Sequence, residues 1–165
     1  MNFEVLSRQR ARKMSFSSNI DDCIIVSITD TYSERNRFAT NEHIKAVLHI
    51  QFDDVEKGET NCITQEQGKK IYDFVMSNKH LANKIIVHCE AGISRSSGVC
   101  AALMKIINGN DFDVFDNPRF TPNMTCYRTV LEQHFKILDE QDIINNEKHN
   151  IEVWAREFEK GEDER

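Results

Sequence analysis

The sequence has few of the features that mark secreted, membrane-spanning or metal-binding proteins. Its apolar runs are only a few residues long, which is too short to cross a bilayer, and its start lacks the apolar core of a secretory signal. The five cysteines form no short paired spacings, so a disulfide framework is not indicated. No C-x-x-C pair or H-E-x-x-H helix offers a metal site. We therefore expect a cytoplasmic protein without membrane contact, metal or other cofactor.

An excess of positive charge is also lacking. The chain has 21 Lys and Arg against 27 Asp and Glu, a net charge of −6, which argues against general nucleic-acid binding. A basic cluster near the start is interpreted as a surface helix, with a docking site as the alternative; it contains Arg8, Arg10, Arg12 and Lys13. With 39% hydrophobic and 29% charged residues, we expect residues 1–165 to form a single globular domain. Its core would lie at about residues 20–140, and a charged tail at residues 157–165 would fray.

The most informative segment is H-C-E-A-G-I-S-R-S, from His88 to Ser96. It follows an apolar run, residues 85–87, and precedes a helix-like stretch, so it forms a junction between a strand and a helix. The backbone N–H groups of such a loop can surround one anion, and the N-terminus of the following helix adds partial positive charge. The residues expected to bind a phosphate group in this way are Glu90, Ala91, Gly92, Ile93, Ser94 and Arg95.

This junction also contains the groups that phosphate chemistry needs. Cys89 lies at the mouth of the loop, where the same electric field favours its thiolate form, a strong nucleophile. The guanidinium of Arg95 can bind two phosphate oxygens together. The hydroxyl of Ser96 can donate a hydrogen bond to the sulfur when the thiolate leaves a phosphocysteine intermediate. Gly92 allows the sharp turn that aims the amides inward.

Cys-x5-Arg-Ser after a hydrophobic strand and a histidine resembles the signature loop of the cysteine-dependent protein phosphatases, and A-G-I-S-R-S resembles the dual-specificity branch of that family. The resemblance covers most of residues 20–140. It implies a phosphotyrosine-phosphatase-like fold and hydrolysis through a phosphocysteine intermediate. A phosphorylated protein would be the substrate.

A general acid is expected to protonate the leaving oxygen. Asp53 and Asp54 follow the strand that ends near Phe52, and in an open α/β sheet ligands bind at such strand ends. The family resemblance maps the acid onto Asp54, which we favour over Asp53, with Asp30 as a weaker third candidate. Paired aspartates after a strand can also be a solvated turn.

Two further residues are expected to support the loop. His88 would orient it and help to stabilise the thiolate without transferring a proton. Asn123 matches an asparagine that braces the signature loop in the resembling family, although a polar residue at a helix start is an equally good interpretation.

Hydrophobic periodicity predicts an α/β fold in which helices flank a mainly parallel sheet of about four to five strands. The expected strands are residues 23–28, 46–52 and 84–88, with a short edge strand at 3–6. A capping box at Thr64 predicts a helix over residues 64–78. Another helix should run from Ser94 to residue 107 and end at Asn108-Gly109. Thr121-Pro122 is predicted to start a helix that buries Tyr127, Val130, Leu131, Phe135 and Leu138. Trp154 and Phe158 would anchor the last helix.

These patterns favour a protein phosphatase acting on phosphotyrosine, with phosphoserine and phosphothreonine open. The alternatives are a phosphate-recognising module with little catalysis and a phosphatase for a phosphoinositide or an RNA 5′-phosphate. An acidic Glu90 disfavours a highly charged head group. Residues 31–41 are interpreted as a surface loop, with a wall of the substrate site as the alternative.

Overall fold

The chain folds around a four-stranded sheet in which all pairs of neighbouring strands are parallel. The computed structural model describes residues 1–163, and only the backbone of residues 161–163. The strands are β1 (Asn2–Ser7), β2 (Cys23–Thr29), β3 (Ile44–Gln51) and β4 (Lys84–Cys89), in the order β1-β4-β2-β3. The α/β fold and the strand at the edge are therefore confirmed.

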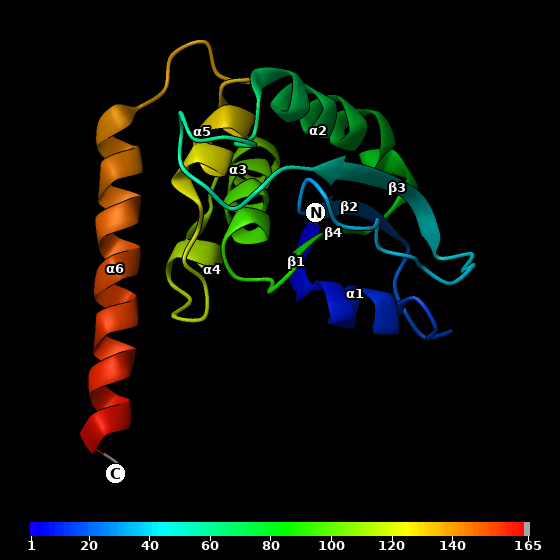
Figure 1. Ribbon diagram of the computed structural model, residues 1–165, viewed down its shortest axis with the longest axis horizontal. Coiled ribbons are helices and arrows are strands. Elements are labelled where there is room, and N and C mark those ends of the chain that lie inside the picture. The colour runs from blue at the N-terminus through cyan, green and yellow to red at the C-terminus, as the bar shows by residue number, and fades with distance from the viewer. Residues whose placement is uncertain (164–165) are drawn as a thin grey trace.

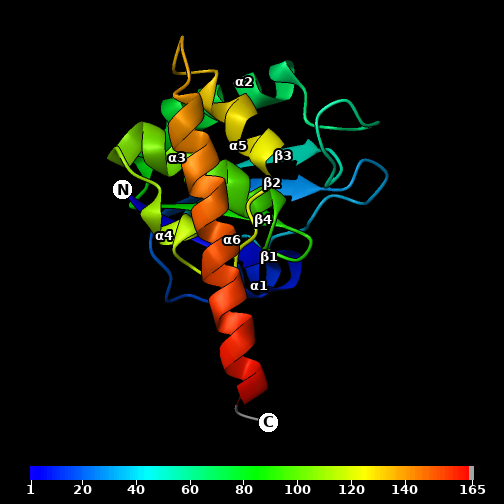
Figure 2. The same cartoon turned by 90° about the vertical axis from the view of Figure 1, so that its left-hand side faces the viewer.

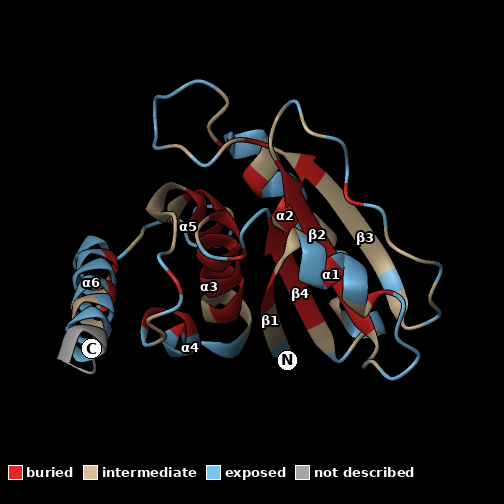
Figure 3. Cartoon of the chain, turned by 60° about the horizontal axis from the view of Figure 1, so that its bottom comes forward, coloured by how far each residue is buried: buried red, intermediate tan, exposed pale blue. Residues whose placement is uncertain are grey.

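Helices cover both faces of this sheet (Figure 1). They are α1 (Arg8–Met14), α2 (Gln65–Asn78), the 3-10 turn η1 (Lys79–Leu81), α3 (Arg95–Asn108), α4 (Phe112–Phe115), α5 (Met124–Leu131) and α6 (Glu140–Asp163). The main hydrophobic core lies between the sheet and α2, α3 and α5, and a smaller cluster lies under α1 on the opposite face. The central strands β2 and β4 carry β-branched residues on both faces and are almost wholly buried (Figure 3).

Several local predictions are confirmed. The basic cluster forms the surface helix α1. Thr64 and Gln67 make the predicted capping box of α2, and Gly109 ends α3 in a left-handed conformation with φ 80°. Ser94 is the residue before α3.

The prediction for the start of α5 is wrong. The N-cap is Asn123, whose Oδ1 accepts a hydrogen bond from Cys126 N at 2.9 Å, so Thr121 and Pro122 lie outside the helix. The backbone N–H groups of Thr121 and Asn123 donate to the carbonyls of Ile93 and Ser94 at 3.2 and 3.1 Å. These bonds tie the segment to the loop after β4, which keeps it extended until Asn123.

The end of this helix also differs from the prediction. α5 ends at Leu131, so Phe135 and Leu138 follow it in the connection to α6. Asp139 accepts a hydrogen bond from Asp142 N at 3.0 Å, the pattern of a helix N-cap, so a new helix begins there. Leu138 still packs against the core, whereas Phe135 is partly exposed.

The last helix is longer and less tightly anchored than predicted. α6 runs beside the rest of the molecule, and its C-terminal part projects beyond it (Figures 1 and 2). Ile143 and Asn150 are its buried residues, whereas Trp154 and Phe158 are exposed and stack on each other with ring centroids 5.5 Å apart. Residues 157–163 continue the helix instead of fraying; residues 164 and 165 lie outside the described residues.

The register of the sheet determines where the functional groups can meet. Ser7 pairs with Cys89 and Ser27 with His88, so the parallel strands end at the same edge. The residues that follow these strands, including Asp30, Asp53 and Glu90, are therefore brought to one side of the molecule.

Candidate active site

The loop after β4 approaches the end of β1 so closely that it needs a glycine. Gly92 has φ 72°, and a Cβ built there would lie 2.5 Å from the backbone carbon of Leu6. The carbonyl of Glu90 accepts a hydrogen bond from Arg8 N at 3.1 Å, which fixes the other side of the loop. The turn from strand to helix is thus held against a neighbouring strand.

Cys89 lies at the base of this loop, where two polar groups contact its sulfur. Its Sγ is 3.0 Å from Ser96 Oγ and accepts a bond from Gly92 N at 3.3 Å. The side chain is buried, and α3 begins at Arg95 beside it. A hydroxyl, an amide and a helix N-terminus therefore surround one sulfur.

The guanidinium of Arg95 is held from two strand ends. Nη1 donates to the carbonyl of Phe52 at 2.7 Å and lies 2.6 Å from Asp30 Oδ1. Only 5% of the side chain is exposed, and Nε is buried without a partner among the described residues. A buried donor of this kind is rare unless a ligand satisfies it, and an oxyanion held by the loop would do so.

The two paired aspartates have different environments. Asp53 accepts bonds from Thr31 N and Asn61 Nδ2, both at 2.9 Å, and these hold the pKa of its carboxyl below the ordinary value. It therefore anchors a turn in its ionised form. Asp54 is exposed and accepts bonds from Ser94 Oγ at 2.8 Å and Asn123 Nδ2 at 3.0 Å, which places it beside the loop.

Asn123 combines both of the roles considered for it. Its Nδ2 donates to Asp54 and, at 3.2 Å, to the carbonyl of Val55, while its Oδ1 caps α5. Its own N–H donates to the carbonyl of Ser94. Asn123 thus contacts the acid candidate and a helix start through its side chain, and the signature loop through its backbone N–H.

His88 is fully buried and orients the loop without carrying charge. Nε2 lies 2.8 Å from Ser27 Oγ and 3.3 Å from Asn36 Nδ2, and because an amide nitrogen only donates, Nε2 accepts. The proton is then on Nδ1, which lies 3.3 Å from the carbonyl of Cys89. Burial lowers the pKa of His88 to about 4, so near pH 7 the side chain is neutral and contacts the loop through hydrogen bonds alone.

Of the remaining loop residues, the side chains of Ala91 and Ile93 are exposed, and that of Glu90 forms an ion pair with Arg8 at 3.3 Å. They contribute backbone to the loop. The sequence reasoning missed Ser27 and Asn36 as partners of His88 and assigned Asp30 only as a weak acid candidate, not as a partner of Arg95. Asp30 directly follows a central strand, and this position was the available signal.

The other cysteines are unlike Cys89. All five are free, and burial raises the pKa of Cys100 and Cys126 above the ordinary value and that of Cys23 to about 11. Burial likewise raises the pKa of Cys62. These thiols are therefore not activated as nucleophiles.

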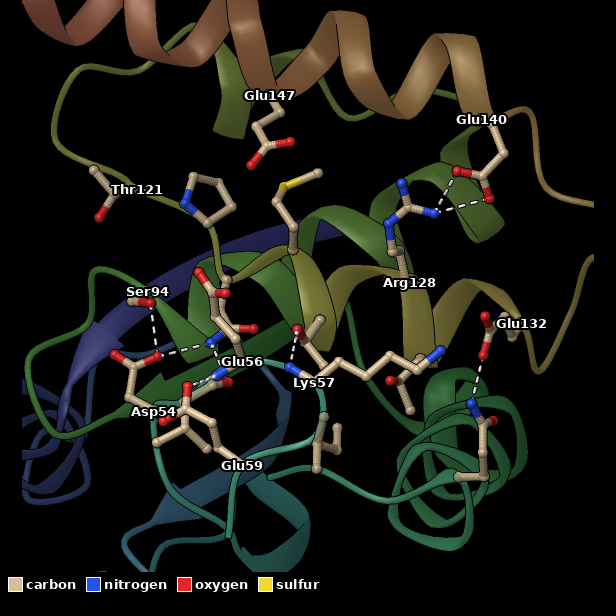
Figure 4. Close-up of a pocket in the computed structure, with 18 residues that line it drawn as sticks. Asp54, Glu56, Lys57, Glu59, Ser94, Thr121, Arg128, Glu132, Glu140 and Glu147 are labelled. Carbon is tan, nitrogen blue, oxygen red and sulfur yellow. Dashed lines mark hydrogen bonds and ion pairs between the residues drawn. The ribbon is translucent and has the colours of Figure 1, made fainter. Parts of the chain in front are cut away.

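The site opens into a groove of about 920 Å³ that runs from Asp54 and Ser94 along α5 towards α6 (Figure 4). Carboxylates line much of it, and Arg128 is paired there with Glu140. Within residues 1–163, no group of His, Cys, Asp or Glu side chains could hold a metal ion. Over the same residues, no helix is long and apolar enough to cross a membrane.

Comparison with known proteins finds similar sequences and similar structures, and no family model matches the chain. The human dual specificity protein phosphatase 5 is 34% identical over 138 residues, which is 80% of this chain and 34% of that protein. The protein of the same name from Rattus norvegicus is 33% identical over 100 residues, 60% of this chain and 24% of that protein. The chain thus spans about a third of the length of the human relative and about a quarter of the length of the rat relative.

The fold is similar to that of a mouse dual specificity phosphatase whose crystal structure was solved with zinc tungstate. The TM-score is 0.56 at 17% identity, and the match covers 86% of each chain. The sequence likeness, the shared fold and the signature loop agree. The chain belongs to the cysteine-dependent protein phosphatases of the dual-specificity and protein-tyrosine type.

Proposed function

We propose that the protein hydrolyses phosphotyrosine in a protein substrate, with phosphoserine and phosphothreonine as further candidates. The observation that carries the proposal is the meeting of Cys89 Sγ with Ser96 Oγ, Gly92 N and the start of α3, beside the buried guanidinium of Arg95. This arrangement supports a nucleophile and an oxyanion cradle in one place.

In the first half-reaction, Cys89 Sγ attacks phosphorus, an S–P bond forms and the P–O bond to the substrate breaks. Asp54, in its protonated form, gives its proton to the leaving oxygen. The loop amides and Arg95 hold the three equatorial oxygens, where negative charge is spread in the transition state.

In the second half-reaction, the Asp54 carboxylate takes a proton from water while the water oxygen attacks phosphorus. The S–P bond breaks, and inorganic phosphate and a thiolate are released. Ser96, 3.0 Å from the sulfur, stabilises this thiolate as it leaves. Asn123 and Ser94 keep the Asp54 carboxylate beside the loop through the whole cycle.

The proposal is tested with a small aryl phosphate in the presence of a chelator. We expect turnover by the native protein, none by Cys89→Ser, and phosphate binding in both. Asp54→Asn should lower kcat by about a hundredfold to ten-thousandfold, the usual contribution of a general acid.

Asp53→Asn is the matched control, because it removes a neighbouring carboxylate that contacts Thr31 and Asn61 instead of the loop. Asp53→Asn should lower the melting temperature and leave kcat nearly unchanged. A large loss of kcat in Asp53→Asn, with little loss in Asp54→Asn, would assign the acid role to Asp53. Binding of phosphate without any turnover by the native protein would indicate a recognition module instead of an enzyme. Location in the cytoplasm and a single domain over residues 1–165 stay predictions.

A further inference from the structure

A small apolar pocket lies between α6 and the segment that precedes α5. It has a volume of about 230 Å³ and is lined by Phe115, Thr121, Pro122, Met124, Glu147, Asn150, Ile151 and Trp154. Sites for small molecules commonly have volumes of about 300–1,000 Å³, so this pocket suits one large side chain better than a cofactor. The reaction proposed above uses none of the residues that line it.

Polar contacts hold the α6 wall of the apolar pocket in place. Asn150 is buried and donates to the carbonyls of Phe115 and Phe120, both at 3.1 Å. One turn of the helix earlier, His149 lies 2.6 Å from Asp116. Because this wall is fixed to the body of the molecule, a ligand would bind here without the cost of ordering a mobile helix.

Two apolar side chains of this wall are turned towards solvent. Ile151 is 60% exposed and Trp154 is 47% exposed. They are three positions apart, so they lie on the same face of the helix. Single exposed apolar residues are common on protein surfaces, but neighbouring ones that border an apolar pocket are typical of a binding surface.

The apolar pocket adjoins the groove that opens from the active site. Thr121, Pro122, Met124 and Glu147 line both hollows. The N–H of Thr121 donates to the carbonyl of Ile93 at 3.2 Å, so the shared wall is attached to the signature loop itself. A peptide whose phosphorylated residue enters the loop can therefore follow one surface from the loop to the pocket.

The groove between the loop and the apolar pocket is acidic. Its charged lining residues are Asp54, Glu56, Glu59, Glu132, Glu140 and Glu147, against Lys57 and Arg128. Arg128 is already paired with Glu140 at 2.6 Å. Glu147 points from α6 into the groove and has no ion pair among the residues that the structure describes (Figure 4). A Lys or Arg of a peptide in this groove would be attracted, and an Asp or Glu would be repelled.

We propose that the apolar pocket binds one large apolar side chain of the phosphoprotein substrate, on the same segment as the phosphorylated residue, and that the acidic groove favours a Lys or Arg between the two. This inference rests on the proposed function and narrows its substrate class. Ile151 and Trp154 would act through substrate binding alone, since neither belongs to the groups that contact phosphate.

The test moves a single leucine, one position at a time, through phosphotyrosine peptides that otherwise carry alanine near the phosphotyrosine. We expect leucine at one position, or at two adjacent ones, to raise kcat/KM about fivefold or more over the peptide without leucine. The gain should come from a lower KM at unchanged kcat, because the pocket binds the ground state and the transition state equally. High salt should not reduce it, because the contact is apolar.

A lysine or a glutamate is then placed between this leucine and the phosphotyrosine. The lysine peptide should have the higher kcat/KM, and high salt should reduce the difference between the two peptides. Equal values, or a preference for glutamate, would show that the peptide does not follow the acidic groove and would overturn the inference.

Ile151→Ala and Trp154→Ala should each remove about half or more of the gain from leucine, because each takes away part of the pocket wall. Turnover of the aryl phosphate should stay within about twofold of the native protein. Ile144→Ala is the matched control, because Ile144 is a partly exposed isoleucine about two turns before Ile151 that lines neither hollow. It should keep the gain.

If the aryl phosphate is hydrolysed but leucine makes no difference at any position, or if either pocket variant keeps the full gain, this inference is wrong and the proposed function stands. A dimer of the native protein that Trp154→Ala dissociates would also overturn it, because a second copy would then cover the pocket. If the native protein does not hydrolyse the aryl phosphate at all, the proposed function fails and the inference fails with it.

Discussion

At the scale of single residues, Arg95 shows how a buried cation is kept in position. Asp30 and the carbonyl of Phe52 both contact Nη1, and they come from the ends of different strands. Both contacts are made by the same nitrogen of the guanidinium. Among the described residues Nε has no hydrogen-bond partner, so it is available to an incoming anion. We therefore propose that Asp30 is a positioning residue, which would act on the substrate through Arg95.

Asp30→Asn keeps the shape of the side chain and removes its charge. We expect kcat/KM for an aryl phosphate to fall about tenfold or more, because a guanidinium that is less firmly oriented binds the transition state less well. Inhibition by inorganic phosphate should weaken in parallel. Asp73→Asn, which affects only the surface pair with Lys69, is the control and should change neither value. A loss of melting temperature without weaker phosphate binding would show that Asp30 has only a structural role.

The sequence predicts the residues of the signature loop because they are consecutive, so their chemistry can be recognised together. The partners of that loop are far away in the chain: Asp30, Ser27 and Asn36 reach it only because β2 pairs with β4. The charge state of His88 is likewise invisible in the sequence, because it depends on complete burial.

At the scale of elements, α3 and α5 approach each other at a glycine. A Cβ on Gly98 would lie 2.4 Å from the carbonyl oxygen of Asn123, a backbone atom that cannot move independently. This contact brings the start of α5 against α3, where the side chain of Asn123 donates a hydrogen bond to Asp54. Helix packing and the site geometry therefore depend on the same small residue.

Gly98→Ala should push the start of α5 away from α3. We expect destabilisation by about 1–3 kcal/mol, the usual cost of overpacking, although alanine has the higher helix propensity. The melting temperature should fall by roughly 2–4 °C for each kcal/mol. Aryl phosphate turnover should also fall, since Asn123 moves relative to Asp54. A variant that is as stable and as active as the native protein would contradict this account of the packing.

Element boundaries were predicted well where a local signal decides them, as at the capping box of α2 and the glycine after α3. The start of α5 was predicted wrongly because its deciding contacts are long-range: Thr121 and Asn123 bond to the carbonyls of Ile93 and Ser94. Thr121, Pro122 and Asn123 all suit a helix start, and only the tertiary contacts select among them.

At the scale of the whole molecule, the buried His88 couples protonation to folding. Burial lowers its pKa from the ordinary value of 6.5 to about 4. Between these values the unfolded chain binds a proton that the folded chain does not, so stability falls as pH decreases from 6.5 towards 4. Below pH 4 both states are protonated, and this contribution stops changing. The total loss from this group is roughly 3 kcal/mol.

His88→Gln should flatten the dependence of unfolding free energy on pH over that range, measured by denaturant titration. His49 is the comparison, because burial and the nearby Arg35 lower its pKa too, but it is less deeply buried. His49→Gln should therefore flatten the dependence less than His88→Gln does. An unchanged slope in His88→Gln would show that His88 is not the group responsible.

The overall architecture was the most predictable level, because alternating strand and helix patterns permit few parallel arrangements. The position of α6 was less predictable. Asn150 fixes it by donating to the carbonyls of Phe115 and Phe120, and such polar contacts leave no periodic pattern in the sequence. Trp154 and Phe158 were expected to anchor the last helix, but they are exposed and stack on each other.

The bonds from residues 121 and 123 back to the loop have a consequence for the order of synthesis. A ribosome makes the chain from its N-terminus, so all strands and Cys89 emerge before the segment that holds the loop in place. While the chain is being made, the loop after β4 therefore exists for a time without these two bonds. We expect the loop to reach its final shape only after residues 121–123 have been made.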